Sequence, residues 1–143
     1  MALRYANVYG PRQDPHGEAG VVAIFSGNLA ADRVSTINGT GKQTRDYVYA
    51  GDVARANILA LENDPHSGGY NIGTSIETSV DRLYEMLRSI SGRELPPEYG
   101  PAKPGEQLRS SIDPTRAGRV LNWRPETKLA AGLKETLLYF GAL

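Results

Sequence analysis

The chain has 143 residues, long enough for one domain with a hydrophobic core, and its 40% apolar and 22% charged content is typical of a globular protein. The formal net charge of zero and the lack of cysteine exclude a broad electrostatic attraction to nucleic acid or membranes, a disulfide, and a thiolate metal site or nucleophile. No apolar run approaches the ~20 residues of a membrane-spanning helix and the start lacks a signal-peptide core, so we expect a cytoplasmic protein.

The first part of the chain alternates short strands with a longer helix, which predicts an α/β fold. A strand is expected over residues 2–7. A helix over about residues 19–31 follows a polar loop, and short strands at residues 34–37 and 47–49 lie on either side of a turn at Asn38-Gly39. The apolar face expected for this helix consists of Val21, Ile24, Phe25 and Leu29.

Two more helices are expected in the middle of the chain, separated by a short strand at residues 70–72. Asp52 is expected to cap the first helix. Thr78, with Asp81 three residues later, resembles a capping box at the start of the second helix, and Gly92 is expected to end it. The expected apolar faces are Ala54, Ile58 and Leu61 in the first helix, and Val80, Leu83, Leu87 and Ile90 in the second.

The C-terminal part begins with an irregular connector over residues 96–105. Asp113-Pro114 places an N-cap residue before a proline at the first helical position, which predicts a short helix ending at Leu121. A last helix is expected to begin near Thr127. Its apolar face consists of Leu129, Leu133, Leu137 and Phe140.

Several catalytic signatures are missing or fail on their expected geometry. The sequence contains no Gly-x-Ser-x-Gly motif and no Gly-x-Gly-x-x-Gly dinucleotide fingerprint. Tyr99 and Lys103 have the Tyr-x-x-x-Lys spacing of short-chain dehydrogenases, but Gly100-Pro101 prevents the helical turn on which that pair depends. His16 and His66 lie in separate loops without spaced partner ligands, so no metal site is expected.

Arg45, which follows a glycine-rich turn over residues 39–41, is the best candidate for anion binding. Its guanidinium group is either a bidentate fork for phosphate oxygens or one half of a structural salt bridge with Asp46 or another carboxylate. Lys103 is either a second cation of the same site or a surface lysine. Asn7 offers its amide either to a ligand or to a turn.

Four motifs occur in a fixed order along nearly the whole chain. They are Leu3-Arg-Tyr-Ala-Asn-Val-Tyr-Gly-Pro-Arg-Gln-Asp-Pro with Gly17-Glu-Ala-Gly-Val-Val-Ala-Ile-Phe, then Gly41-Lys-Gln-Thr-Arg-Asp-Tyr-Val-Tyr, Tyr70-Asn-Ile-Gly and Lys103-Pro-Gly-Glu. Together they resemble the extended short-chain dehydrogenase/reductase family of NAD-dependent nucleotide-sugar epimerases and dehydratases, most of all bacterial UDP-glucose 4-epimerases. The resemblance implies the C-terminal part of a Rossmann-type enzyme: a small substrate-binding α/β domain with edge strands of the parallel sheet.

The resemblance also implies a substrate site. In the family, the positions of Asn7 and Arg45 contact the pyrophosphate of the substrate, and the position of Glu106 meets the ribose. The position of Lys103 is usually arginine, so a lysine there would act as a point charge. The full set of substrate-binding residues implied by the family is Asn7, Gly20, Val21, Ser35, Thr36, Ile37, Arg45, Lys103 and Glu106.

The family chemistry that the resemblance implies is reversible oxidation of the sugar C4 hydroxyl by tightly held NAD, with a tyrosine as base. In the family, the glycine fingerprint and the tyrosine–lysine pair precede the strand with which this chain begins. We therefore assign no catalytic, cofactor-binding or metal-binding residue, and we expect no NAD on this chain alone.

Three hypotheses follow from the resemblance. The first is that residues 1–143 are a single C-terminal substrate-binding portion without the N-terminal NAD-binding half, whose ligand is a UDP-sugar. The second is a free-standing binding module derived from this family, and the third is a chain that pairs with a separate N-terminal half. In each case, the parent enzyme is alternatively a nucleotide-sugar dehydratase or decarboxylase. We expect self-association through exposed strand edges or through the surface of the missing half, and no nucleic-acid or membrane partner.

Overall fold

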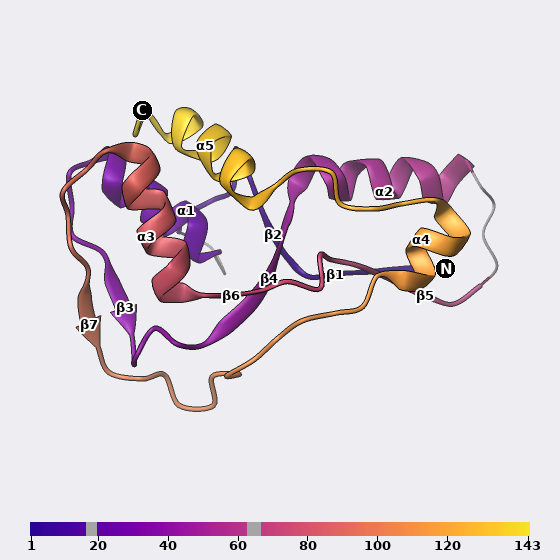
Figure 1. The fold of residues 1–143 in the computed structure, drawn as a ribbon, viewed down its shortest axis with the longest axis horizontal. Coiled ribbons are helices and arrows are strands. Elements are labelled where there is room, and N and C mark those ends of the chain that lie inside the picture. The colour runs from indigo at the N-terminus through magenta and orange to yellow at the C-terminus, as the bar shows by residue number, and fades with distance from the viewer. Residues whose placement is uncertain (17–19, 63–66) are drawn as a thin grey trace.

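Short strands and longer helices alternate along the chain, as the sequence predicts (Figure 1). The computed structural model describes residues 1–16, 20–62 and 67–143. In these ranges the strands are β1 Ala2–Tyr5, β2 Asn7–Tyr9, β3 Thr36–Asn38, β4 Thr44–Tyr49, β5 Gly69–Ile72, β6 Glu77–Ser79 and β7 Glu98–Gly100. The helices are α1 Val21–Ala30, α2 Ala50–Glu62, α3 Val80–Ser91, α4 Thr115–Leu121 and α5 Leu129–Phe140. The predicted α/β class is confirmed.

The strand predicted over residues 2–7 is interrupted at Ala6, and its two pieces join different sheets. β1 pairs in parallel with β5, and Ala2 lies opposite Gly69. β2 pairs in parallel with β4, which pairs on its other side with the antiparallel strand β6. The interruption places Asn7 at the start of β2, opposite Tyr47 of the strand that carries Arg45.

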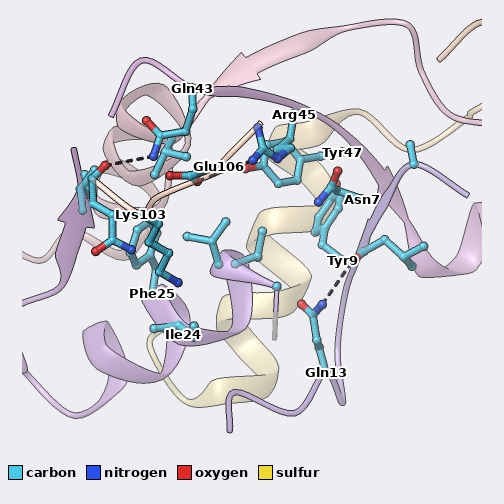
Figure 2. A pocket seen from close by; sticks show the side chains of 18 of the residues that line it. Asn7, Tyr9, Gln13, Ile24, Phe25, Gln43, Arg45, Tyr47, Lys103 and Glu106 are labelled. Atoms are coloured by element: carbon cyan, nitrogen blue, oxygen red, sulfur yellow. Dashed lines mark hydrogen bonds and ion pairs between the residues drawn. The ribbon is translucent and has the colours of Figure 1, made fainter. Parts of the chain in front are cut away.

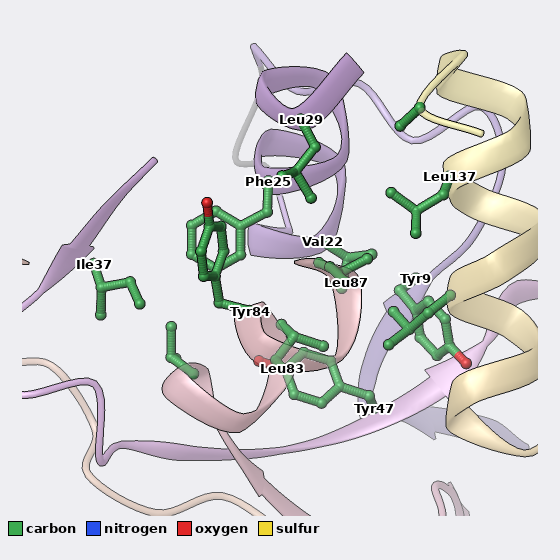
Figure 3. Close-up of a cluster of buried hydrophobic side chains, with 13 residues drawn as sticks. Tyr9, Val22, Phe25, Leu29, Ile37, Tyr47, Leu83, Tyr84, Leu87 and Leu137 are labelled. Carbon is green, nitrogen blue, oxygen red and sulfur yellow. The ribbon is translucent and has the colours of Figure 1, made fainter. Parts of the chain in front are cut away.

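The first of two hydrophobic clusters lies where α1, α3 and α5 gather at one end of the molecule (Figures 1 and 3). Phe25 of α1 and Tyr84 of α3 meet edge to face, with ring centroids 5.0 Å apart. Leu87 and Leu137 are fully buried beside them. Aromatic and leucine side chains of three helices thus pack against β2 and β4.

The predicted apolar face of α1 needs one correction. Phe25 and Leu29 are buried as expected, but Ile24 is exposed. The helix begins at Val21, and the predicted start at Ala19 lies outside the described residues. Only part of the apolar stripe therefore packs inward, because the outer part borders a cavity.

The predicted apolar face of α2 is wrong. Ala54, Ile58 and Leu61 are exposed, and Val53, Ala56 and Ala60 are buried in a second cluster with Tyr70 and Trp123. Small side chains allow the helix to pack closely against β4, β2 and α4, which the larger stripe would prevent. The predicted capping role of Asp52 is wrong as well, because α2 begins at Ala50.

The start of α3 is shifted by one residue from the prediction. Ser79 is the N-cap residue, and its hydroxyl accepts a hydrogen bond from the Arg82 backbone N–H at 3.2 Å. Thr78 is buried instead. The predicted stop at Gly92 is confirmed, because this residue adopts a left-handed conformation with φ of 67°.

The predicted irregular connector contains a strand, β7, which pairs in parallel with β3. Beyond β7 the chain runs along one side of the molecule to α4 (Figure 1). α4 ends at Leu121 as predicted, and Asp113 accepts from the Thr115 N–H at 2.9 Å, although the N-cap position itself is Pro114. α5 begins at Leu129, and the predicted residues Leu133 and Leu137 are buried.

Candidate functional site

A cavity of about 470 Å³ opens above the first hydrophobic cluster (Figure 2). Its walls come from β2, β3, β4, the start of α1 and the loop after β7. Of the predicted substrate-binding residues, it brings together Asn7, Gly20, Val21, Thr36, Ile37, Arg45, Lys103 and Glu106. The remaining one, Ser35, is fully buried behind the wall, where its hydroxyl oxygen accepts from Asn28 Nδ2 at 3.2 Å.

Arg45 lines the cavity from the middle of the β2–β4–β6 sheet. Its Nη1 donates to the Thr44 carbonyl at 2.8 Å and to the Gln107 carbonyl at 2.7 Å. Its Nη2 lies 3.6 Å from Glu106 Oε1. Of the structural salt bridges raised from the sequence, the one with Asp46 is absent, because neighbouring side chains of a strand point to opposite faces, and the carboxylate beside Arg45 is that of Glu106.

Asp46 has a structural role on the other face of β4. It is only 1% exposed, and its carboxylate accepts from the backbone N–H of Thr74 at 2.9 Å, of Ser75 at 3.0 Å and of Ile112 at 3.4 Å. Several backbone donors satisfy a buried carboxylate without a cation. The network ties β4 to two loops and thereby fixes the strand from which Arg45 extends.

Gln13, which was not predicted, packs against the start of α1. Its Nε2 donates to the Val8 carbonyl at 3.1 Å, and its Oε1 is buried without a hydrogen-bond partner in the described part of the chain. A Cβ atom on Gly20 would lie 2.3 Å from Gln13 Nε2. A side chain at position 20 would therefore displace the Gln13 amide from its present place. The sequence held no signal for it, since polar side chains are ordinary in loops.

α1 begins at the cavity wall without a side-chain cap, because its N-cap residue is Gly20. The first N–H groups of a helix have no partners within the helix, and the helix dipole makes this end attractive to anions. The start of α1 and the guanidinium group of Arg45 thus border the same cavity.

The loop after β7 brings two opposite charges to the rim of the cavity. The Glu106 N–H donates to the Lys103 carbonyl at 3.2 Å, and Gly105 between them has φ of 75°. Pro104 followed by a glycine of positive φ is the composition of a type II turn. Lys103 is exposed and Glu106 is half-buried, and both line the cavity.

Tyr47 is a second lining residue that the sequence did not reveal. Its hydroxyl is buried and has no hydrogen-bond partner within the described residues. Burial raises the pKa of Tyr47 to about 12, although the positive charge of Arg45 opposes the shift. The phenol therefore stays protonated at neutral pH and is available as a hydrogen-bond donor to an acceptor in the cavity.

The opposite end of the cavity is more apolar. Ile37 of β3 and Phe25, one turn into α1, are almost completely buried there. Gln43 Nε2 donates to the Asn38 carbonyl at 3.0 Å, which holds the glycine-rich turn against β3. The cavity thus has Arg45 and Glu106 on one side and Phe25 on the other, where Figure 2 also shows Lys103.

Two other features were searched for in the described ranges. Residues 1–16, 20–62 and 67–143 contain no group of three or more His, Asp or Glu side chains that could hold a metal ion. His16 is exposed, and His66 lies outside these ranges. None of the helices in them is long and apolar enough to cross a membrane.

A protein-family model and individual known proteins match this chain, and they agree on one family. The model of the NAD dependent epimerase/dehydratase family matches residues 1–73. A UDP-glucose 4-epimerase of Mycolicibacterium smegmatis is 48% identical over 137 residues, which cover 94% of this chain and 43% of that protein.

Solved structures agree with this likeness. The UDP-glucose 4-epimerase of Thermotoga maritima, solved with UDP-glucose, superposes with a TM-score of 0.92 at 47% identity, over 96% of this chain and 44% of that one. The Thermus thermophilus UDP-glucose 4-epimerase, solved with NAD, has a TM-score of 0.85 at 39% identity, over 96% and 45%. The chain spans less than half the length of each of these proteins. The predicted fold, that of the C-terminal part of an extended Rossmann-type enzyme, is confirmed.

Proposed function

The chain belongs to the NAD dependent epimerase/dehydratase family, and from this premise we propose that it binds a nucleotide sugar, a UDP-sugar, as the substrate-binding portion of a sugar 4-epimerase. The observation that carries the proposal is the convergence of Arg45, Lys103 and the uncapped start of α1 on one cavity. Two cations and a helix N-terminus suit a diphosphate, whose charge is spread over several oxygens.

The presence of both cationic and apolar side chains in the cavity wall supports a nucleoside diphosphate over a simple anion. We assign the diphosphate to Arg45, Lys103 and the amide of Asn7, with the backbone of Gly20-Val21 beside it. The base would lie at the apolar end, next to the wall formed by β3. The residues assigned to that end are Ser35, Thr36 and Ile37, of which Ser35 supports the wall from behind.

Glu106 is assigned to the ribose. A carboxylate can accept hydrogen bonds from hydroxyl groups, and such charge-assisted bonds are the stronger kind. Glu106 lies on the rim of the cavity, next to Arg45, where a sugar joined to a diphosphate would pass.

NAD, the cofactor of the family, does not fit the residues present. Dinucleotide binding in Rossmann folds uses a Gly-x-Gly-x-x-Gly turn between a strand and a helix, and the sequence has no such motif. In the family NAD supplies the hydride chemistry; we derive no step through it here. The role proposed for this chain is to bind and orient the nucleotide sugar, and we assign it no catalytic residue.

The proposal is tested by calorimetric titration of the 143-residue chain with UDP, UDP-glucose and a dTDP-sugar. UDP and UDP-glucose should bind, and Arg45→Ala should weaken binding by about 1.5–3 kcal/mol because it removes charge-assisted hydrogen bonds. Arg82→Ala, which removes an exposed arginine of α3 outside the cavity, is the matched control and should leave binding unchanged. Absence of UDP binding to the unaltered chain would contradict the proposal.

The same titration separates the alternative parent enzymes. Tighter binding of the dTDP-sugar than of UDP-glucose would favour the corresponding part of a 4,6-dehydratase. An assay of epimerase turnover by the chain alone should give none, and turnover without added protein would contradict a purely binding role.

A further inference from the structure

The guanidinium group of Arg45 is engaged unevenly. Nη1 donates to Thr44 and Gln107 carbonyls at 2.8 and 2.7 Å, which uses both of its hydrogens. Nη2 faces Glu106 Oε1 at 3.6 Å, and in the described ranges Nη2 and Nε have no other acceptor. A phosphate oxygen can therefore bind Arg45 only through Nη2 and Nε, and the Glu106 carboxylate stands at Nη2.

The backbone holds Glu106 in this position from both sides. The turn from Lys103 to Glu106 is closed by the 3.2 Å hydrogen bond between them. Beyond Glu106, the Leu108 carbonyl accepts from the Thr44 N–H at 2.9 Å, which anchors the loop to β4. The carboxylate can thus leave Arg45 by rotating its side chain, while its backbone stays beside the cavity.

Both groups are partly shielded from water, which strengthens charge effects between them. The side chain of Arg45 is 18% exposed and that of Glu106 is 26% exposed. Coulomb interactions at such partly buried positions are several times stronger than in bulk water. A phosphate that arrives at Arg45 consequently meets an opposing negative charge that open solvent does not screen away.

We propose that Glu106 is a selectivity residue, which competes with the diphosphate for Arg45 and thereby excludes anions that carry no hydroxyl-bearing group. This inference rests on the proposed function. An inorganic anion displaces the Glu106 carboxylate from Arg45. The carboxylate then lies next to the negative charge of the anion and has no hydrogen-bond donor in place of Arg45. A nucleoside diphosphate also displaces it but brings ribose hydroxyls, from which the released carboxylate accepts hydrogen bonds. Glu106 therefore penalises the first ligand more than the second.

The test compares inorganic pyrophosphate with UDP by calorimetry on the full chain and on Glu106→Gln, which removes the charge and keeps the shape. Glu106→Gln should bind pyrophosphate about fivefold tighter, which corresponds to loss of competition from one partly exposed ion pair. It should bind UDP no tighter than the unaltered chain, because the gain at the diphosphate is offset by a weaker bond to the ribose. The preference for UDP over pyrophosphate should fall about fivefold.

Glu98→Gln is the matched control, since it removes the same charge from an exposed position of β7 outside the cavity. It should leave both affinities within about twofold, as a surface charge does. Glu106→Ala is a second charge-removing variant, and thermal unfolding shows which variants are folded.

The outcomes separate this inference from the function on which it rests. If the unaltered chain binds UDP but neither Glu106 variant tightens pyrophosphate binding, the selectivity role is overturned and nucleotide binding stands. If the unaltered chain binds neither UDP nor pyrophosphate, the proposed function fails and the selectivity role falls with it. Tightening by Glu98→Gln as well would show a general charge effect and would also overturn it.

Discussion

The part of the molecule around the cavity and the part built on β1 and β5 enclose their hydrophobic clusters in different ways. Around the cavity, α1, α3 and α5 pack against one another and cover the sheet with leucine and aromatic side chains. On β1 and β5, α2 and α4 cover the sheet, while Tyr5 of β1 and Ile58 and Leu61 of α2 stay exposed. The proposed binding site thus lies beside the cluster that three helices enclose, although Ile24, Leu138 and Tyr139 on the outer sides of those helices are exposed too.

The two parts are joined at the start of α2. The Asp52 carboxylate accepts from the backbone N–H of Glu126 at 3.2 Å and of Thr127 at 3.0 Å, in the segment that leads into α5. The Asp52 carbonyl accepts from Trp123 Nε1 at 2.9 Å. One residue of α2 therefore holds the segment between the two clusters.

The largest expected effect on stability comes from opening a cavity in the cluster enclosed by α1, α3 and α5. Leu87→Ala should lower the free energy of unfolding by about 3 kcal/mol, because Leu87 is fully buried among three helices. The matched control, Leu61→Ala on the exposed face of α2, should change it by less than ~0.5 kcal/mol. Urea denaturation measures both, and equal losses would contradict the comparison.

The connection between the parts is tested by Asp52→Asn, which should cost about 2 kcal/mol at neutral pH. Burial raises the pKa of Asp52, but hydrogen bonds from Thr127, Arg55 and Glu126 lower it more, so the net shift is below its ordinary value of 3.8. A lowered pKa contributes stability above pH 3.8 that is lost as the pH falls below it.

The free energy of unfolding should therefore fall on acidification below about pH 4 in the unaltered chain, and this loss should be smaller in Asp52→Asn. Urea denaturation across pH 3 to 7 measures the difference. Arg55→Ala is the control, since it removes one partner and keeps the carboxylate. Parallel pH profiles for Asp52→Asn and the unaltered chain would contradict the assignment.

The exposed side chains of α2 should also control self-association of the chain. Self-association, which we expect from the sequence, stays a prediction, and the exposed Ile58 and Leu61 beside the open β1–β5 sheet are the side chains to change. Ile58→Glu with Leu61→Glu should weaken association at least tenfold, about 1.4 kcal/mol, because apolar contacts are replaced by like charges. Sedimentation across a concentration series measures it, and a monomer at high concentration in the unaltered chain would contradict the prediction.

The smallest effect is expected at Tyr47. Its buried hydroxyl lacks a partner in the described residues, so Tyr47→Phe should leave the chain unchanged or stabilise it by up to ~1 kcal/mol. If the hydroxyl donates to the ligand, the same variant should weaken UDP binding. Thermal unfolding with and without UDP distinguishes the two effects, and a clear loss of stability without ligand would contradict this description.

The positions of the helices could be predicted from apolar spacing, but not always the face that each one buries. α2 has two stripes that satisfy helical periodicity, and the stripe of small residues is buried because it permits close packing. β7 could not be predicted, because its pairing with β3 depends on a partner more than sixty residues away. The break at Ala6 had no local sequence signal either, because it arises where the chain changes its pairing partner from β5 to β4.

The candidate site was predictable where a motif carried it. Arg45, Asn7 and Lys103 were candidates from their chemistry and from the resemblance to the family, and the structure places them around one cavity. Gln13 and Tyr47 were missed because their positions depend on packing against Gly20 and on burial by three helices, which no local pattern expresses.

The strand that carries Arg45 has consequences for how the site opens. β4 is paired with β2 over residues 47–49 and with β6 over residues 44–46, and its other edge at Thr44 is bonded to residues 108 and 110. Such a strand opens only when most of the protein unfolds, whereas at the turn Lys103–Glu106 the side chains can move while the backbone stays hydrogen-bonded. For the proposed binding of a nucleotide sugar, the chain entropy lost would then be confined to one turn, because Arg45 is already held in place.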